Sequence, residues 1–172
     1  VLMQLLTGRR RPTAGTVRTC GIDPAADRQG FSREVGVLFE ADSLYASRSP
    51  RGNLAFHARL RGLPDARVDE VLALVGLADH DGAKLERLSS GMRRRLAFGI
   101  AILHRPSVLI LVDPFARCDE ASIGLLHERL REHAKRGGAT LVLADTDAYL
   151  FDLCDQILEF DLKPGERHEW TK

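Results

Sequence analysis

The chain has 172 residues, of which 44% are hydrophobic and 28% charged, so we expect one soluble globular domain with a buried core and exclude a disordered or fibrous protein. Its formal net charge of +1 creates no field that would require a nucleic acid or an anionic membrane as a partner. Three widely spaced cysteines, and no apolar run of the roughly 18 residues that a membrane span needs, predict a cytoplasmic location, which includes the inner face of the membrane.

The first predicted elements are a helix and two strands. Leucines within residues 2–6 share one helical face, and Gly8 is typical of a helix end. Residues 15–20 and 34–39 have the apolar character and the length of strands. Because the chain starts with Val1 already inside the helix, we expect the domain to be truncated at its N-terminus.

The middle of the chain changes to a helical period. Leu54, Val68, Leu72 and Val75 recur at spacings that place them on one side of successive helices. We therefore expect a helical insertion at about residues 48–104, between strands that come before and after it.

The last third alternates between strands and helices. Residues 108–112 are fully apolar and rich in β-branched side chains, as in a central parallel strand covered on both faces. An amphipathic helix over 120–135, a buried strand over 139–144, a short helix over 147–155 and a strand over 156–162 follow. This order predicts an α/β fold with a parallel sheet.

An acidic residue stands at the carboxyl end of the central strand, where parallel α/β sheets bind their ligands. Asp113, followed by Pro114, has two interpretations. It holds a magnesium-bound water or polarises an attacking water at a nucleotide site, or it caps the turn after the strand. The residue by itself leaves both open.

A second candidate site lies about two dozen residues upstream, at the start of a predicted helix over 93–103. Ser89 and Ser90 are suitable N-caps, and Gly91 permits close approach of the backbone. Free N–H groups at such a helix end attract phosphate. The arginines at 93–95 either await that anion or lie on an exposed face as solvated charges.

Together these segments resemble the nucleotide-binding domain of the ATP-binding cassette (ABC) family. L-S-S-G-M, which ends at Met92, is similar to the signature loop L-S-G-G-Q, and P-S-V-L-I-L-V-D-P-F is similar to the Walker B strand. Asp119 falls at the D-loop aspartate. L-L-T-G-R-R-R-P-T-A-G-T-V resembles the segment that follows the phosphate-binding Walker A loop. The resemblance implies a P-loop-NTPase-like sheet with an inserted helical subdomain over 1–162, and a tail or linker over 163–172.

Three positions depart from the family pattern. The family's strand ends in a magnesium-binding Asp and a water-polarising Glu, but here Val112 and Asp113 stand before Pro114, so either register loses one carboxylate. Glu40 replaces the Q-loop glutamine, and Thr146 replaces the switch histidine. We assign no metal ligand, keep Asp113 as an impaired catalytic candidate, and predict that the chain alone does not hydrolyse ATP.

The resemblance implies that two such domains meet head to tail around ATP. Ser89, Ser90 and Gly91 are then expected to contact ATP held by a second ABC ATPase domain, in a homodimer or heterodimer, with Asp119 assisting across the interface. ATP and Mg²⁺ are expected to bind weakly or only in that dimer. A membrane permease subunit is a further expected partner, through residues 40–62.

Two alternatives stay open at this point. The chain resembles, more loosely, ABC-like modules of LytTR-type transcription regulators, and a DNA-binding domain would then lie outside it. No direct contact of this chain with nucleic acid is expected, because its basic clusters lack aromatic partners. The other alternative is an active transporter ATPase, which needs an upstream G-x-x-x-x-G-K-S/T loop and tolerance of Val112.

Overall fold

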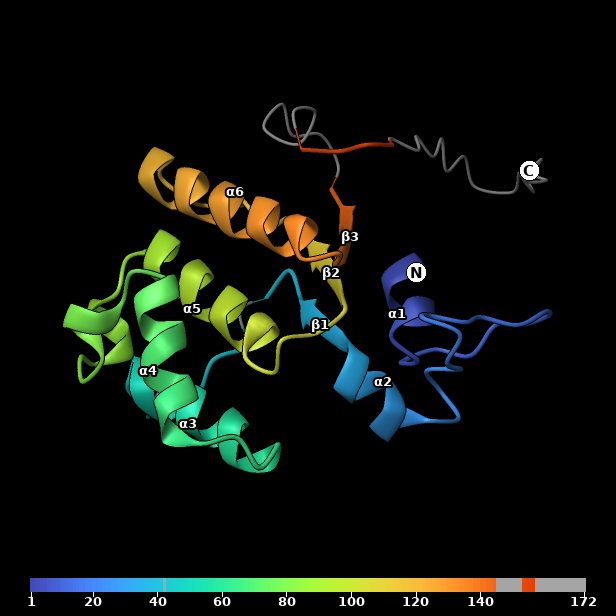
Figure 1. The fold of residues 1–172 in the computed structure, drawn as a ribbon, viewed down its shortest axis with the longest axis horizontal. Coiled ribbons are helices and arrows are strands. Elements are labelled where there is room, and N and C mark those ends of the chain that lie inside the picture. Colours follow the sequence, from blue (N-terminus) through green and yellow to red (C-terminus); the bar gives the residue numbers. More distant parts are fainter. Residues whose placement is uncertain (42, 145–152, 157–172) are drawn as a thin grey trace.

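The computed structural model describes residues 1–41, 43–144 and 153–156. Three parallel strands form its sheet in the order β1-β2-β3, with β2 in the middle (Figure 1). These strands are β1 (Val35–Leu38), β2 (Val108–Val112) and β3 (Ala139–Leu143). The predicted α/β fold with a parallel sheet is confirmed.

Six α-helices and two short 3₁₀ turns belong to the described part of the chain, and three of the helices lie between β1 and β2 in the sequence. These three helices lie together beside the sheet, with α5 packed against β1 (Figure 1), and they make up the predicted helical insertion. The elements are α1 (Leu2–Leu6), α2 (Arg28–Glu34), α3 (Pro50–Leu60), α4 (Asp65–Leu74), α5 (Ser90–Ile102), α6 (Glu120–Lys135), η1 (Ala78–His80) and η2 (Leu85–Arg87).

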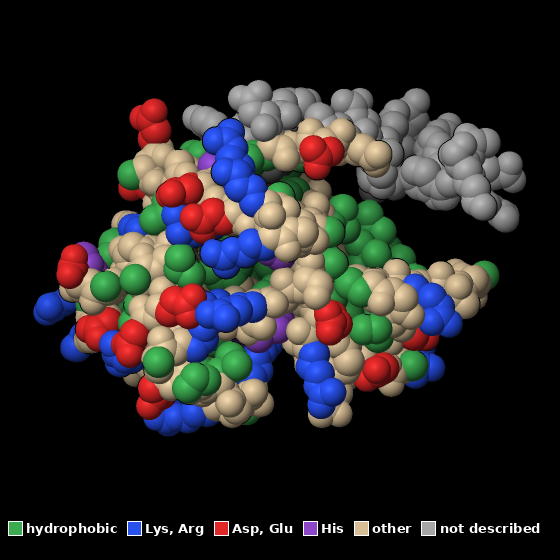
Figure 2. All heavy atoms as spheres, in the orientation of Figure 1, with side chains coloured by type: hydrophobic (Ala, Val, Ile, Leu, Met, Phe, Trp, Pro, Cys, Tyr) green, Lys and Arg blue, Asp and Glu red, His purple; other side chains and the backbone are tan. Residues whose placement is uncertain are grey.

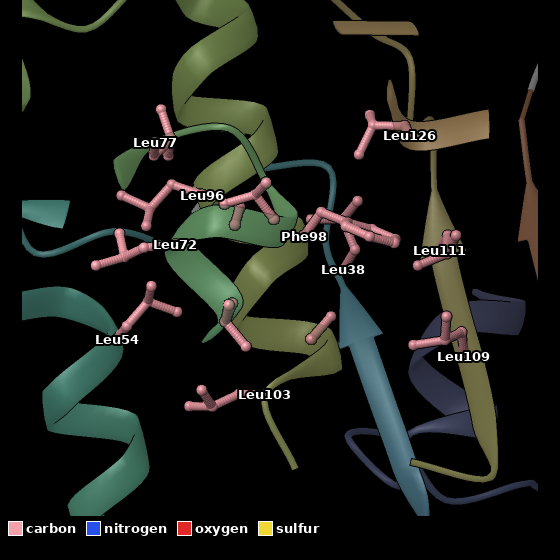
Figure 3. Close-up of a cluster of buried hydrophobic side chains, with 14 of the residues drawn as sticks. Leu38, Leu54, Leu72, Leu77, Leu96, Phe98, Leu103, Leu109, Leu111 and Leu126 are labelled. Carbon is pink, nitrogen blue, oxygen red and sulfur yellow. The ribbon is translucent and has the colours of Figure 1, made fainter. Parts of the chain in front are cut away.

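The central strand β2 divides the core into two parts, because successive side chains of a strand point to opposite faces. Leu109 and Leu111 join the larger cluster, which includes Phe98 of α5 and is formed mainly by the helices (Figure 3). Ile110 joins a smaller cluster with Phe31 on the opposite face. Both faces of β2 are therefore covered, as its unbroken apolar sequence predicts.

The contact between β1 and α5 depends on a glycine. A Cβ atom at Gly36 would lie 2.2 Å from the carbonyl oxygen of Ala101, which is a backbone atom and has little freedom to move. This close approach fixes the position of α5 against the sheet. The N-terminus of α5 is thereby held near the carboxyl edge of the strands.

The strand predicted over residues 15–20 is wrong. The segment forms only an isolated antiparallel bridge between Thr19 and Ile22. Gly15, Cys20 and Gly21 all have positive φ angles, which turn the chain repeatedly. An extended segment also needs a neighbouring strand for its N–H and C=O groups, and no strand of the described residues lies alongside this one.

Strand β3 is present, but its expected burial is not observed. Its first three residues are exposed, and Leu141 is 38% exposed. The reason is that β3 pairs only with β2 within the described ranges, so that one edge carries no further strand. Its apolar sequence alone did not reveal this.

Helix α2 was not predicted. Its signal was short: Asp27 is the N-cap, and its side chain accepts a hydrogen bond from the N–H of Gly30 at 2.7 Å. The predicted helix over 147–155 and the strand over 156–162 lie largely outside the described residues. No helix of the described part is both long and apolar enough to cross a membrane.

Candidate functional site

The carboxyl ends of β1 and β2 meet the N-terminal turn of α5 at one place, and a buried arginine joins them. Arg94 is only 2% exposed. Its guanidinium donates to the carbonyl oxygens of Phe39 at 2.7 Å and Glu40 at 3.3 Å, which follow β1. The same group donates to the carbonyl oxygen of Asp113 at 2.7 Å and to that of Val112, at the end of β2.

This contact connects three of the positions that the sequence singled out. Arg94 belongs to the helix that carries the signature loop. Its guanidinium binds the backbone at the Q-loop position Glu40 and at the Walker B position Asp113. A further bond, from Nε of Arg94 to the carbonyl oxygen of Pro114 at 3.3 Å, extends the network along the turn after β2. Arg94 therefore fixes how the strand ends sit relative to the signature loop.

Asp113 takes an unusual backbone conformation directly after β2. Its φ angle is +43°, in the left-handed region that Asp tolerates better than most residues. Its N–H donates to the carbonyl oxygen of Leu143 at 2.9 Å, and its own carbonyl oxygen accepts from the N–H of Ala116 at 3.0 Å. The backbone thus makes a tight turn at the end of the strand, and both interpretations of the Asp113 side chain stay open.

The signature loop is capped as its sequence predicts. Ser89 is the N-cap of α5, and its hydroxyl accepts a hydrogen bond from the N–H of Met92 at 3.1 Å. The first N–H groups of a helix have no partner within it, so those of Ser90 and Gly91 point out of the helix end. The Ser90 hydroxyl donates to the carbonyl oxygen of Arg117 at 2.8 Å.

Gly91 packs against the D-loop position. A Cβ atom at Gly91 would lie 2.7 Å from Oγ of Ser122 and 3.2 Å from Oδ1 of Asp119. Asp119 is the N-cap of α6 and accepts from the N–H of Ser122 at 2.9 Å. Hydrogen bonds from Ser122 lower the pKa of the Asp119 carboxyl, so the carboxylate form is favoured. The signature loop and the D-loop position thus form one packed unit.

The three adjacent arginines of α5 differ in their surroundings. Arg95 donates to the carbonyl oxygens of Val75 at 2.9 Å and Gly76 at 3.1 Å, where α4 ends. Arg94 is buried in the network described above, and Arg93 lines a cavity. An exposed face of solvated charges therefore describes neither Arg94 nor Arg95.

That cavity has a volume of about 300 Å³ and opens between the signature loop and the turn after β2. Three arginines and one glutamate supply its charged lining. The lining residues are Glu40, Ser90, Arg93, Arg94, Ala116 and Arg117. The cavity brings the Q-loop and signature positions to one place and favours an anion.

The described residues beside this cavity do not form a magnesium site by themselves. Mg²⁺ prefers several oxygen ligands in an octahedral arrangement. Among the residues with a described structure, no three His, Cys, Asp or Glu side chains gather, and Val112 brings no carboxylate to the strand end. Thr146, at the switch position, lies outside the described residues.

A second cavity, of about 420 Å³, lies between the sheet edge at β1, the segment that follows α1, helix α2 and the helical insertion. Figure 2 shows the surface notched between these two parts of the molecule. Its lining combines an apolar floor with Arg9, Arg28, Arg61, His57 and His104. The guanidinium of Arg9 stacks 3.8 Å from the ring centre of Phe39.

His104 in this cavity makes stability depend on pH. Burial, and next the charge of Arg61, lower its pKa from 6.5 to about 4. The unfolded chain therefore takes up this proton first, so the free energy of unfolding should fall as pH decreases from about 6.5 to about 4. We expect His104→Gln to flatten this slope in urea titrations, whereas the exposed His80→Gln should not. An unchanged slope in His104→Gln would contradict this assignment.

Sequence reasoning missed two residues of this site. Arg94 was seen only as one of three adjacent charges, although its acceptors lie up to 55 positions away in the chain. Arg117 was not considered, because a single arginine in a turn carries no motif. A positive φ of 61° at Arg117 is visible only in the structure.

The family model described as ABC transporter matches residues 1–116. A methionine import ATP-binding protein, MetN of Geobacillus kaustophilus, is 30% identical over 91% of this chain and 48% of its own length. The cytochrome c biogenesis ATP-binding export protein CcmA of Methylococcus capsulatus is 34% identical over 82% and 69%. The Nod factor export ATP-binding protein I of Burkholderia lata is 32% identical over 90% and 52%. The chain spans about half the length of most of these relatives.

A solved structure titled "Structure of ATP binding subunit of ABC transporter" superposes with a TM-score of 0.78 at 23% identity. It matches 90% of this chain, and the match covers 66% of that structure's chain. At this identity the likeness supports the fold. The relatives named above are import and export proteins, so they give no support to the LytTR-type alternative.

Proposed function

This chain belongs to the ABC transporter family, and we propose that within a transporter it is a degenerate ATP-binding domain whose signature loop contacts ATP held by another subunit. The partner is a second, intact ATP-binding domain. This chain responds to the nucleotide and does not hydrolyse ATP alone.

The observation that carries this proposal is the contrast between the two halves of the site. The signature half is fully built: Ser89 caps α5, and Gly91 packs against Asp119 without room for a side chain. The catalytic half lacks the carboxylate at Val112 and has Glu40 in place of glutamine. A built signature loop beside an altered strand end is expected of a domain that acts on a partner's nucleotide.

Contact with a membrane permease is proposed for residues 40–62. In this segment Tyr45 is 45% exposed and meets Phe56 edge to face, with ring centres 4.9 Å apart. Asn53 is fully buried and binds the backbone of Tyr45 through both its oxygen and its nitrogen. The segment thus presents an aromatic surface on a hydrogen-bonded base, and aromatic side chains are enriched at protein–protein interfaces.

The proposal is tested by association that depends on nucleotide. Analytical ultracentrifugation of this chain with an intact ATP-binding subunit should show a heterodimer with ATP and separate chains with ADP, because a bound ligand stabilises only the state that binds it. The partner alone, at the same total concentration, is the control. Association that is equal in ATP and ADP would contradict the proposed response to nucleotide.

A further inference from the structure

The lining of the cavity beside the signature loop contains more arginines than acidic side chains. Arg93, Arg94 and Arg117 line it, and Glu40 is the acidic side chain in its lining. Arg94 is occupied by the carbonyl oxygens of the strand ends. Arg93 and Arg117 donate no hydrogen bond to these oxygens among the described residues.

Arg117 presents an available guanidinium. It is exposed, and within the described residues its side chain forms no hydrogen bond or ion pair. Its backbone has a φ of +61°, and its carbonyl oxygen is held by the Ser90 hydroxyl at 2.8 Å. The turn is thus fixed to the signature loop, while the charged end remains available to a ligand.

Arg93 has an incompletely satisfied guanidinium. Its Nε–H is buried and finds no acceptor among the residues described. One terminal nitrogen donates to the carbonyl oxygen of Glu86 at a long 3.3 Å. A buried donor without an acceptor is unfavourable, and Arg93 is one of the residues that line the cavity.

We propose that Arg93 and Arg117 form a phosphate-binding pair that receives the polyphosphate tail of a nucleotide beside the signature loop. A planar guanidinium group can donate two parallel hydrogen bonds to two oxygens of one phosphate. The lining contains no aromatic ring and only Ala116 as an apolar side chain, so nothing in it stacks on a base. The pair therefore recognises the phosphates and not the nucleoside.

The pair deepens the proposed function and rests on it for the source of the ligand, a nucleotide carried by the partner. Binding of the phosphate groups themselves needs no partner. Arg93 directly follows the signature loop in the sequence, and Arg117 lies beside it through the hydrogen bond with Ser90. Both are distinct from the loop residues Ser89, Ser90 and Gly91. They give this chain a means of holding the nucleotide that does not use its altered strand end.

Calorimetric titration of the chain with sodium tripolyphosphate tests the pair. We expect Arg93→Gln and Arg117→Gln each to weaken binding about tenfold, since each removes one charge-assisted contact. Arg131→Gln removes the same charge from an exposed position of α6 and should bind within about twofold of the unchanged chain. Arg117→Lys keeps the charge but not the planar group, and its affinity should lie between those of Arg117→Gln and the unchanged chain.

ATP and adenosine separate the phosphate groups from the base. ATP should bind within about threefold of tripolyphosphate, and adenosine should not bind. Equal affinity in the double variant Arg93→Gln/Arg117→Gln and the unchanged chain would overturn the pair, as would the absence of tripolyphosphate binding. Circular dichroism confirms that each variant is folded.

The result of the tripolyphosphate titration does not depend on the result of the association experiment with the partner subunit. Tripolyphosphate binding that depends on the pair, together with association indifferent to ATP, would contradict the proposed function and leave the pair standing. ATP-dependent association with no effect of either arginine on tripolyphosphate binding would overturn the pair alone.

Discussion

Gly91→Arg is expected to remove the contribution of this chain to ATP turnover in a mixture with an intact partner. A Cβ atom at this position already meets Oγ of Ser122 at 2.7 Å and Asp119 at 3.2 Å. An arginine must therefore push α5 away from α6 or fill the space that the nucleotide needs. Because a displacement of about 1 Å can lower a rate about 100-fold, turnover should fall to that of the partner alone.

The matched control is Gly124→Arg, since a Cβ atom at Gly124 on α6 meets nothing within 4 Å. This variant adds the same side chain and charge to the neighbouring helix and should keep the turnover of the mixture. Gly91→Ala gives a milder test that does not depend on how an arginine is accommodated. Full turnover with a folded Gly91→Arg protein would exclude the signature loop from the reaction.

Arg94→Met is expected to destabilise the domain by about 3 kcal/mol, because it leaves several carbonyl oxygens at the partly buried strand ends without their donor. Arg94 is 2% exposed, and its acceptors follow β1 and β2. Methionine fills much of the same volume, so the loss should come mainly from the missing hydrogen bonds. The midpoint of urea unfolding measures it.

Arg131→Met serves as the control, because Arg131 is exposed on α6 and its loss should change stability by less than about 0.5 kcal/mol. Arg94→Lys should be intermediate, since a compact ammonium group with three donors cannot span the same set of oxygens. A loss below about 1 kcal/mol in Arg94→Met would show that water replaces the guanidinium at the strand ends.

The elements with strong local signals were predictable. Strand β2 and helix α6 have the predicted bounds, since β2 is unbroken in apolar character and α6 begins after Asp119 and ends before Gly137. The helical insertion follows from its change of period. These features depend on residues that are close together in the sequence, so they can be predicted without knowing the fold.

The predictions that were wrong depend on what a segment packs against in the folded chain. Residues 15–20 have a strand-like pattern but no neighbouring strand in the described part of the chain, and β3 has an apolar sequence but an open edge. Arg94 and Arg117 acquire their roles from segments brought together by the fold. The N-cap Ser89 at the start of α5 was predictable from the sequence, whereas the cavity beside it was not.

ATP turnover by this chain, by an intact partner subunit and by their mixture tests the central claim most directly. The missing carboxylate at Val112 and the built signature loop predict no turnover by this chain alone, and a rate for the mixture that exceeds the sum of the separate rates. Hydrolysis by the purified chain alone, above the protein-free background, would contradict this account.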